Sequence, residues 1–443
     1  MKKIDRRHRL AVYVTAFAIA ATLYACGGGG GGGPGPGNPG PTRSYQMGTT
    51  PFFATPTLFP DWRFENLEDK DLLSIHADDF WGVPWDQCNA SGCTPPAAWV
   101  AKWTTFANTA RSQGKTLYLA LSPLQDRKRL APKVDTAGNP VRSWEIPAQI
   151  DGNGCYRFST DTSAAAYKDA YISYVRYLIN LLGPSYVSPA IEMNVPFSQC
   201  ASQKAAWITW YTDVHNAIKT TFPSLPVFPT FQIEHMYGIS DPHAACTAGI
   251  TLAACFDQRL SEALIIPGDR IAFSTYPISW KYESEYSFSY PTDTYARVKS
   301  ATPRKIWITE TGWAAVKVLQ SYMHVASGSC GLDLFPTTFA NNTEQENYLR
   351  WLLAEAQTQG FETVIWWLNR DYLDGGVAAT CPCNPATSDT CQLADTFYMA
   401  AGVTGETLLR IFGNMALRNY DRTPRPAHTA WREYFDRTLS PIP

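Results

Sequence analysis

Two glutamates follow apolar runs of the chain, where a charged side chain does not suit a protein core. Glu310 comes directly after Ile306–Thr309, and Glu192 follows Ala190 and Ile191. At the end of a buried strand, such a side chain lies at the edge of the sheet and can face a substrate. Two facing carboxyl groups can act on one bond, one as nucleophile and the other as general acid/base. The sequence therefore predicts that Glu310 and Glu192 form a catalytic pair.

The segments around both glutamates resemble known motifs. Ile306–Trp313 resembles the nucleophile motif on strand seven of glycoside hydrolase clan A barrels, where Thr-Gly-Trp or a similar turn follows the glutamate. Tyr186–Val195 resembles the strand-four segment of the same clan, most closely in the arabinogalactan endo-galactanase-like families. The resemblance covers about residues 48 to 439. It implies a (β/α)8 barrel and a retaining glycosidase with Glu310 as nucleophile and Glu192 as general acid/base, ~5 Å apart. It does not imply galactan as the substrate.

Ile191 departs from that pattern, because those families usually place there an asparagine that binds the sugar 2-hydroxyl. A second alignment matches Asn194-Val195-Pro196 to Asn-Glu-Pro, which puts Val195 at the acid position and implies an inactive barrel. We favour the first alignment, because it keeps a carboxylate and places Asn194 on the strand face that carries Glu192. The second leaves a non-catalytic glycan-binding lipoprotein as the alternative function.

Other residues at predicted strand ends are candidates for binding a sugar. His76 and Asp78 share one face by two-residue alternation, and we expect them to bind substrate hydroxyls; a metal pair or a buried structural link are the alternatives. By resemblance to strand six of the clan, Tyr276 would donate a hydrogen bond to the nucleophile and hold it ionised. Trp367 would form a floor beneath the sugar. The remaining substrate-binding candidates are Trp85, Asn194, Trp280, Trp313 and Asn369.

The elements that position these residues alternate between short apolar runs and longer amphipathic stretches. The predicted strands are Pro51–Ala54, Leu72–His76, Leu117–Leu121, Ala190–Asn194, Val227–Phe231, Ile271–Thr275, Ile306–Thr309 and Val364–Leu368. The predicted helices are Pro96–Gln113, Ser163–Leu182, Gln203–Thr221, Phe256–Ala263, Thr292–Ser300, Thr343–Gln359 and His428–Leu439. Eight alternations predict a single-domain α/β protein with a closed (β/α)8 TIM barrel; an open doubly wound sheet is the alternative.

The segments that follow the predicted strands are long and contain ten of the eleven cysteines. An even number of cysteines in an exported chain favours disulfides, which would staple the rim where barrel enzymes build active sites. We expect Cys88 to pair with Cys93 and Cys246 with Cys255, while the pairing of the other six stays open. Cys381-Pro382-Cys383 lacks a second ligand pair at zinc-site spacing, so we predict neither a metal nor a cofactor.

The first 26 residues are typical of an export signal, with a basic start and an apolar run from Leu10 to Ala25. The end of this run resembles a bacterial lipoprotein cleavage box, in which Cys26 would carry the lipid. Tyr24 departs from that box, so an ordinary signal peptide or an uncleaved anchor are the alternatives. Residues 27–44 are a Gly/Pro-rich tether, and 45–443 form the barrel domain. We expect an exported protein, lipid-anchored in the bacterial cell envelope or at the surface, or secreted.

The composition limits the classes of molecule that we expect the protein to bind. The net charge of −2 gives no electrostatic reason to expect nucleic acid, and no glycine-rich loop follows a predicted strand as a nucleotide site would require. The 15 Trp, 23 Tyr and 21 Phe supply flat rings that suit the faces of sugars. We therefore expect a polysaccharide or oligosaccharide as partner, with membrane contact only through a lipid at Cys26. A purely structural surface protein would account for neither glutamate.

Overall fold

The computed structural model describes residues 41–51, 64–77, 82–125, 127–141, 147–239, 246–278, 291–316, 340–371 and 413–440. The predicted export signal, Cys26 and the tether through residue 40 lie outside the described residues, and their roles stay predictions. Asp78, Trp280 and four of the cysteines lie outside them as well. Among the described residues, no helix is long and apolar enough to cross a membrane.

Eight parallel strands form one sheet in the order β11-β6-β3-β2-β15-β14-β13-β12. Their bounds are β2 Gln46–Thr49, β3 Leu72–Ala77, β6 Thr116–Leu121, β11 Tyr186–Ser188, β12 Thr230–Gln232, β13 Ile271–Thr275, β14 Ile306–Thr311 and β15 Thr363–Trp366. The two outer strands of this order meet, because the Val187 N–H donates to Pro226 O and the Phe228 N–H donates to Val187 O, each at 3.1 Å. The predicted (β/α)8 barrel is confirmed.

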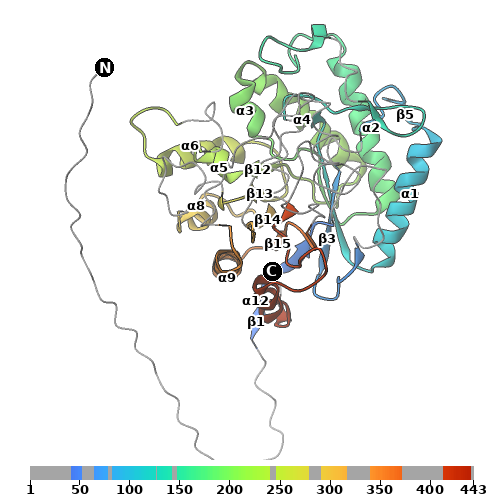
Figure 1. Cartoon of the computed structure of the whole chain (residues 1–443). Coiled ribbons are helices and arrows are strands. Elements are labelled where there is room, and N and C mark those ends of the chain that lie inside the picture. The colour runs from blue at the N-terminus through green and yellow to red at the C-terminus, as the bar shows by residue number, and fades with distance from the viewer. Residues whose placement is uncertain are drawn as a thin grey trace, which may run out of the picture. The chain divides into compact units, whose positions relative to one another are not determined.

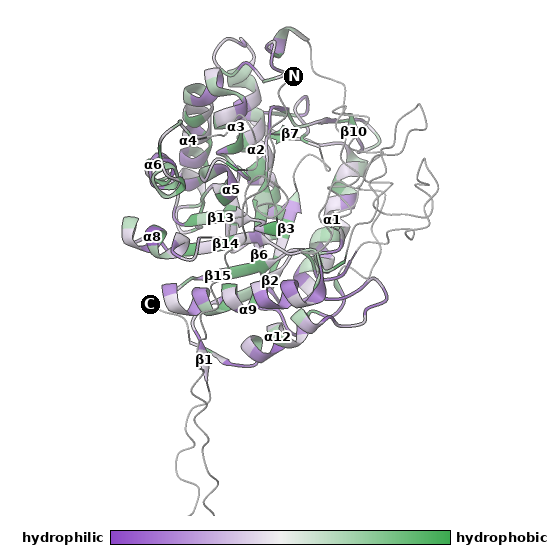
Figure 2. Cartoon of the chain, turned by 60° about the vertical axis from the view of Figure 1, so that its left-hand side comes forward, coloured by the Kyte–Doolittle hydropathy of each residue, from purple (hydrophilic) through white to green (hydrophobic). Residues whose placement is uncertain are grey.

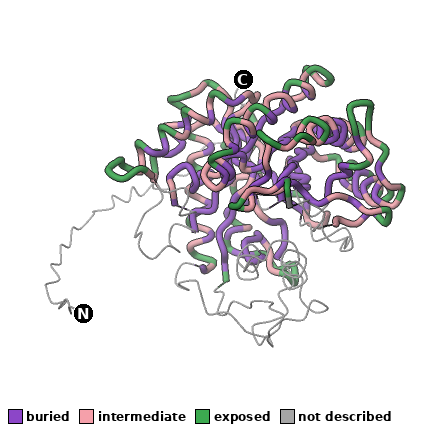
Figure 3. Tube along the Cα trace, turned by 90° about the horizontal axis from the view of Figure 1, so that it is seen from above, coloured by how far each residue is buried: buried purple, intermediate pink, exposed green. Residues whose placement is uncertain are grey.

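Helices surround the strands (Figure 1). The longer ones are α1 Ala97–Ser112, α2 Ala164–Leu182, α4 Lys204–Thr221, α6 Leu252–Leu264, α8 Thr294–Ala301, α9 Asn342–Gln359 and α12 Pro426–Phe435, and α3 Val195–Gln199 and α5 Ile233–Met236 are short. Hydrophobic colouring concentrates on the strands, whereas the helices carry both kinds of residue (Figure 2). Buried segments accordingly lie at the centre, with exposed ones at the periphery (Figure 3). Each helix thus packs an apolar side against the sheet.

Side chains fill the barrel interior. Tyr118 stacks on Phe228 at a centroid distance of 5.9 Å, and Trp307 packs against them at 5.6 and 5.2 Å. Ile191 belongs to the same buried cluster and is 3% exposed. The interior is therefore a packed core rather than a pore, and any substrate must bind at its mouth.

Two predicted strands are displaced along the chain. The first strand is Gln46–Thr49 and ends before Pro51, and the fourth is Tyr186–Ser188 and ends before Pro189. Proline has no N–H to donate to a ladder, which explains why both strands end where they do. Residues 190–194 form bends and turns instead of the predicted strand. At the chain's start, Thr42–Arg43, predicted as tether, forms β1 and pairs with β16 Thr438–Leu439.

Disulfides staple the long segments that follow the strands. The predicted pairs Cys88–Cys93 and Cys246–Cys255 are present. A third bridge, Cys155–Cys200, joins the segment after β6 to the segment after β11. Cys88 and Cys93 lie in the two-residue strands of a hairpin, β4 Cys88–Asn89 and β5 Gly92–Cys93. All six described cysteines lie in segments that follow barrel strands, as expected.

The bridge between Cys155 and Cys200 should contribute more stability than the bridge between Cys88 and Cys93. It spans 45 residues rather than 5, and the loop-entropy model gives about 4 against about 2 kcal/mol. Replacing both members of each pair with serine and measuring urea unfolding tests this order. Equal losses in the two double variants would contradict it.

Candidate active site

An irregularity in β14 aims Glu310 at the mouth of the barrel. Trp307 points into the barrel, so strict alternation would turn Thr309 inward and Glu310 outward. However, the ladder to β13 shifts, because Ile308 pairs with Phe273 whereas Glu310 pairs with Ser274. Such a bulge re-aims the side chains that follow it. Glu310 therefore comes into register with Ser274, which faces the mouth.

Two side chains hold the carboxylate of Glu310. The Tyr276 hydroxyl donates a hydrogen bond to Oε1, as the sequence predicted. His76 Nε2 lies 2.9 Å from Oε2. Burial raises the pKa of Glu310, but the charge and hydrogen bond of His76 and the hydrogen bond of Tyr276 outweigh it and lower the pKa. Glu310 is thus held ionised and in a fixed orientation.

Glu192 lies in the turn after β11, with a left-handed φ of 49°. Its backbone N–H donates to Thr230 Oγ1 at 2.8 Å. Ser274 Oγ donates to its Oε1 at 2.7 Å, and Arg127 Nε donates to its Oε2 at 3.2 Å. Arg127 also has a positive φ, of 59°. Both members of this ion pair adopt a backbone conformation that is unfavourable for residues with a side chain, which is common at functional sites.

The pKa values of Glu192 and Glu310 are shifted in opposite directions. Burial is the largest influence on Glu192 and raises its pKa; the Arg127 charge lowers it, and the Glu310 charge raises it further. Glu310, by contrast, has a lowered pKa. Neighbouring carboxyl groups whose pKa values are pushed apart can act one as a base or nucleophile and the other as an acid.

Other predicted residues lie beside this pair. The rings of His76 and Trp367 meet edge to face with centroids 5.6 Å apart, so Trp367 lies on the Glu310 side of the site. Asn369 is 3% exposed, and its Nδ2 donates to Glu65 O at 2.5 Å. Within the described residues, its Oδ1 has no hydrogen-bond partner. This oxygen is buried.

None of the described contacts joins Trp85 or Trp313 to Glu192 or Glu310. Trp85 is 3% exposed, donates from Nε1 to Ala131 O at 2.7 Å, and stacks on Tyr171 of α2. Trp313 is 5% exposed and packs on Tyr348 of α9 at 5.5 Å. Protein packing accounts for both rings, whatever their predicted role in sugar binding.

Asn194 is not on a strand, contrary to prediction. Its Nδ2 donates to Gln232 O at 2.9 Å, and its Oδ1 accepts from the Gln232 N–H at 2.7 Å. The side chain therefore ties the turn that carries Glu192 to the end of β12. Its amide also borders a hollow of about 290 Å³.

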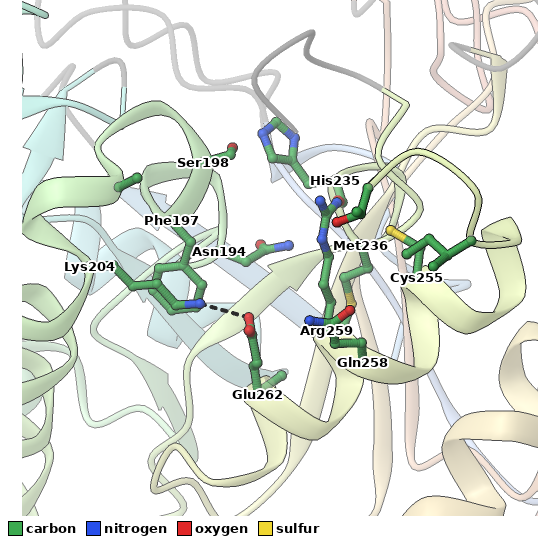
Figure 4. A pocket seen from close by; sticks show the side chains of 14 residues that line it. Asn194, Phe197, Ser198, Lys204, His235, Met236, Cys255, Gln258, Arg259 and Glu262 are labelled. Carbon is green, nitrogen blue, oxygen red and sulfur yellow. Dashed lines mark hydrogen bonds and ion pairs between the residues drawn. The ribbon is translucent and has the colours of Figure 1, made fainter. Parts of the chain in front are cut away.

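This hollow lies between α3, the start of α4, α5 and α6 (Figure 4). Lys204 and Glu262 form an ion pair across it at 2.8 Å. Neither catalytic candidate lines it, but Asn194 is only two residues from Glu192. The hollow thus borders the turn that carries Glu192. Its lining residues are Asn194, Phe197, Ser198, Ala201, Lys204, His235, Met236, Thr247, Ile250, Cys255, Gln258, Arg259, Glu262 and Ala263.

Three polar residues of the site were missed from the sequence. Ser274 is one of many serines, and only the register of β13 against β14 reveals its place. Arg127 stands beside Lys128 and Arg129 after the third barrel strand, and nothing in the sequence separates it from them. Glu234 follows β12 in Phe231-Gln232-Ile233-Glu234, a signal of the kind that identified Glu310. Among the described residues, no cluster of side chains could hold a metal ion.

No protein-family model and no curated protein sequence matches the chain. Solved structures of glycoside hydrolases do match. An exo-β-1,4-mannosidase from Opitutaceae bacterium strain TAV5 has a TM-score of 0.51 and 12% identity, over 89% of this chain and 59% of that one. A GH5_18 protein from Bifidobacterium longum subsp. infantis has a TM-score of 0.50 and 12% identity, over 91% and 80%.

The catalytic domain of a GH53 protein from Ignisphaera aggregans matches at 15% identity over 82% of this chain and 85% of that one, with a TM-score of 0.46. What these proteins share with the chain is the fold. At such identities the matches do not establish an activity. The closer resemblance to the galactanase-like families stays a prediction.

Replacing Tyr276 with phenylalanine should raise the pKa of Glu310, because the carboxylate loses the donor on Oε1. Carboxyl carbon shifts of ¹³C-labelled glutamate, followed by NMR against pH, measure this. Tyr348→Phe is the matched control, since the Tyr348 hydroxyl bonds Thr311 Oγ1 at 2.6 Å. An unchanged Glu310 titration in Tyr276→Phe would show that the hydroxyl does not set its charge.

Proposed function

We propose that this chain is a retaining glycoside hydrolase, with Glu310 as nucleophile and Glu192 as general acid/base. The observation that carries the proposal is the pair of largely buried carboxyl groups, each with a side chain 13% exposed, whose pKa values are pushed in opposite directions. Retaining hydrolysis requires an ionised carboxylate and a protonated carboxylic acid at one bond. The barrel fold shared with glycoside hydrolases supports the same reaction class.

In the first step, a Glu310 carboxylate oxygen attacks the anomeric carbon while Glu192 donates its proton to the departing glycosidic oxygen. The bond to the leaving group breaks, and a glycosyl ester forms on Glu310. Glu192, now ionised, then takes a proton from water, and the resulting oxygen attacks the same carbon. This releases Glu310 as a carboxylate and restores the proton on Glu192.

The neighbours of the two glutamates suit these steps. Tyr276 and His76 hold Glu310 ionised before attack. Arg127 and Ser274 contact Glu192 and would stabilise the carboxylate that exists between the two steps. Each contact fixes a carboxyl group before the substrate arrives, so little reorganisation is needed during the reaction.

We propose a polysaccharide or oligosaccharide as substrate, with its sugar ring on Trp367. The hollow beside α5 and α6 borders the turn that carries Glu192, the residue that would protonate the leaving group. It would accept the leaving part of a longer glycan. Hydrolysis of a panel of plant and microbial polysaccharides, with β-mannosides included, identifies the sugar.

Glu310→Gln should leave folding intact and remove turnover by more than ~10⁴-fold, because the amide has the same shape but cannot attack the anomeric carbon. Hydrolysis of the substrate found in the panel and far-UV circular dichroism are the two measurements. A normal rate in this variant rules out Glu310 as nucleophile.

Glu192→Gln should respond according to the leaving group. A substrate with a poor leaving group should lose ~10²–10⁴-fold in rate, whereas an aryl glycoside with an activated leaving group needs no proton and should still form the glycosyl-enzyme. Added azide should then restore turnover of the activated substrate. Equal losses on both substrates, with no effect of azide, would remove Glu192 as acid/base.

The alternative function is glycan binding without catalysis. Ile191, which stands where the galactanase-like families usually have an asparagine, packs in the barrel interior and offers no amide to a sugar 2-hydroxyl. This alternative predicts glycan binding with no hydrolysis of any panel member by the unaltered protein. Finding turnover excludes it.

We also propose that Cys26 carries a lipid that holds the exported barrel at the cell envelope. The support is the basic and apolar start of the sequence and its cysteine-terminated box. Labelling with a fatty acid in a bacterial host should mark the unaltered chain and not Cys26→Ser.

A further inference from the structure

Glu234 is a third buried glutamate, and no step of the proposed reaction uses it. It is 1% exposed and lies in the single turn of α5, directly after β12. Its Oε1 accepts from Thr275 Oγ1 at 2.7 Å and from the Tyr276 N–H at 2.9 Å. Its Oε2 has no hydrogen-bond partner within the described part of the chain.

These contacts place Glu234 in a pattern at the end of β13. Three consecutive residues there each donate to a different glutamate. Ser274 donates to Glu192, Thr275 donates to Glu234, and Tyr276 donates from its side chain to Glu310. Tyr276 is therefore held at two points, with its backbone on Glu234 and its hydroxyl on Glu310. If the backbone of Tyr276 moved away from Glu234, the Tyr276 hydroxyl would move away from Glu310.

The unpartnered Oε2 indicates the charge state. An ionised carboxylate spreads negative charge over both oxygens, and burying an oxygen without a donor costs more when it is charged than when it is neutral. The neutral acid also leaves Oε1 free to accept both hydrogen bonds from β13. A negative charge on Glu234 would also be repelled by the carboxylate of Glu192.

We propose that Glu234 is a positioning residue that fixes the end of β13 as a neutral carboxylic acid. Its effect on turnover rests on the proposed function, but its position and charge state do not. Burial is the main cause that raises the pKa of Glu234 to about 7, and the charge of Glu192 adds to it, while the hydrogen bonds from Thr275 and Tyr276 oppose it.

Titratable groups face Glu234 from each neighbouring element. Glu192 comes from the turn after β11, Tyr276 from the end of β13, and Tyr348 from α9. His235 follows it on α5, and Arg259 of α6 bonds the His235 carbonyl. A negative charge on Glu192 raises the pKa of Glu234, so the two titrations are linked.

The proposal fixes the direction of a pH effect on stability. The pKa of Glu234 is about 7 in the folded chain, whereas in the unfolded chain it returns to the ordinary glutamate value of 4.5. Between these values the folded state binds more protons, so this contribution to stability falls as pH rises. Glutamine at this position keeps one acceptor oxygen but does not titrate.

The test compares thermal unfolding midpoints of the full chain at pH 5 and pH 8. The midpoint of the unaltered protein should drop more between these values than that of Glu234→Gln. Thr275→Val is the control, because it removes one hydrogen bond from Glu234 but keeps the carboxyl group that titrates, and it should keep the drop. A drop of the same size in Glu234→Gln and in the unaltered protein overturns the neutral acid.

Carboxyl NMR separates positioning from simple packing. One glutamate signal should titrate near pH 7 and vanish in Glu234→Gln, and its pKa should fall in Glu192→Gln, where the neighbouring charge is gone. Glu234→Ala should raise the pKa of Glu310, as Tyr276→Phe does. A Glu310 titration that is unchanged in a folded Glu234→Ala protein overturns the positioning role. These measurements do not require a substrate, so their outcome is independent of the hydrolase proposal.

Discussion

The burial of three glutamates around the end of one strand is the constraint on which this site depends. A buried carboxyl group is unfavourable unless donors or cations meet it. Here β13 supplies donors from Ser274, Thr275 and Tyr276 in succession. Alternation turns the side chains of Ser274 and Thr275 to opposite faces of the strand, so one strand end serves groups on both faces of the sheet. The geometry of β13 therefore decides where all three acids lie.

The differences between the three acids come from what else meets them. Glu310 has His76 on its second oxygen, Glu192 has Arg127, and the second oxygen of Glu234 has no partner among the described residues. The order of their protonation follows from these contacts rather than from the strand that holds them. A substitution at His76 or Arg127 would therefore change the protonation of the glutamate that it contacts, while the fold stays the same.

The sequence predicted much of this arrangement. Apolar runs and amphipathic stretches marked the barrel, and Glu310 and Tyr276 were found because each lies at the C-terminal end of a barrel strand within a familiar motif. Strand four was displaced, because the aliphatic residues around Glu192 fill a turn and the barrel interior rather than a ladder. Pro189 was the available signal for this break. Glu192 was thus identified on the wrong element.

Contacts that arise only when the barrel closes were not predictable in this way. Arg127 and Glu192 are 65 residues apart in the chain, and Ser274 and Glu192 are 82 apart. The meeting of Arg127 with Glu192 depends on their turn conformations, and the place of Glu310 beside Ser274 depends on the bulge in β14. Neither is encoded by a periodicity. Glu234 does follow a strand, as Glu310 follows an apolar run, but no familiar motif surrounds it to single it out.

The pairing of β1 with β16 has a mechanical consequence. These strands join the two ends of the barrel chain at the base, opposite the strand ends that carry the glutamates, and Arg43 fixes them there through Asp71 at 2.7 Å. A pull on the chain at Pro41 is borne first by this base. The load then passes through β2 and its neighbours before it reaches the mouth. A force on this end of the chain therefore acts at the base of the barrel, on the side away from the strand ends that carry the glutamates.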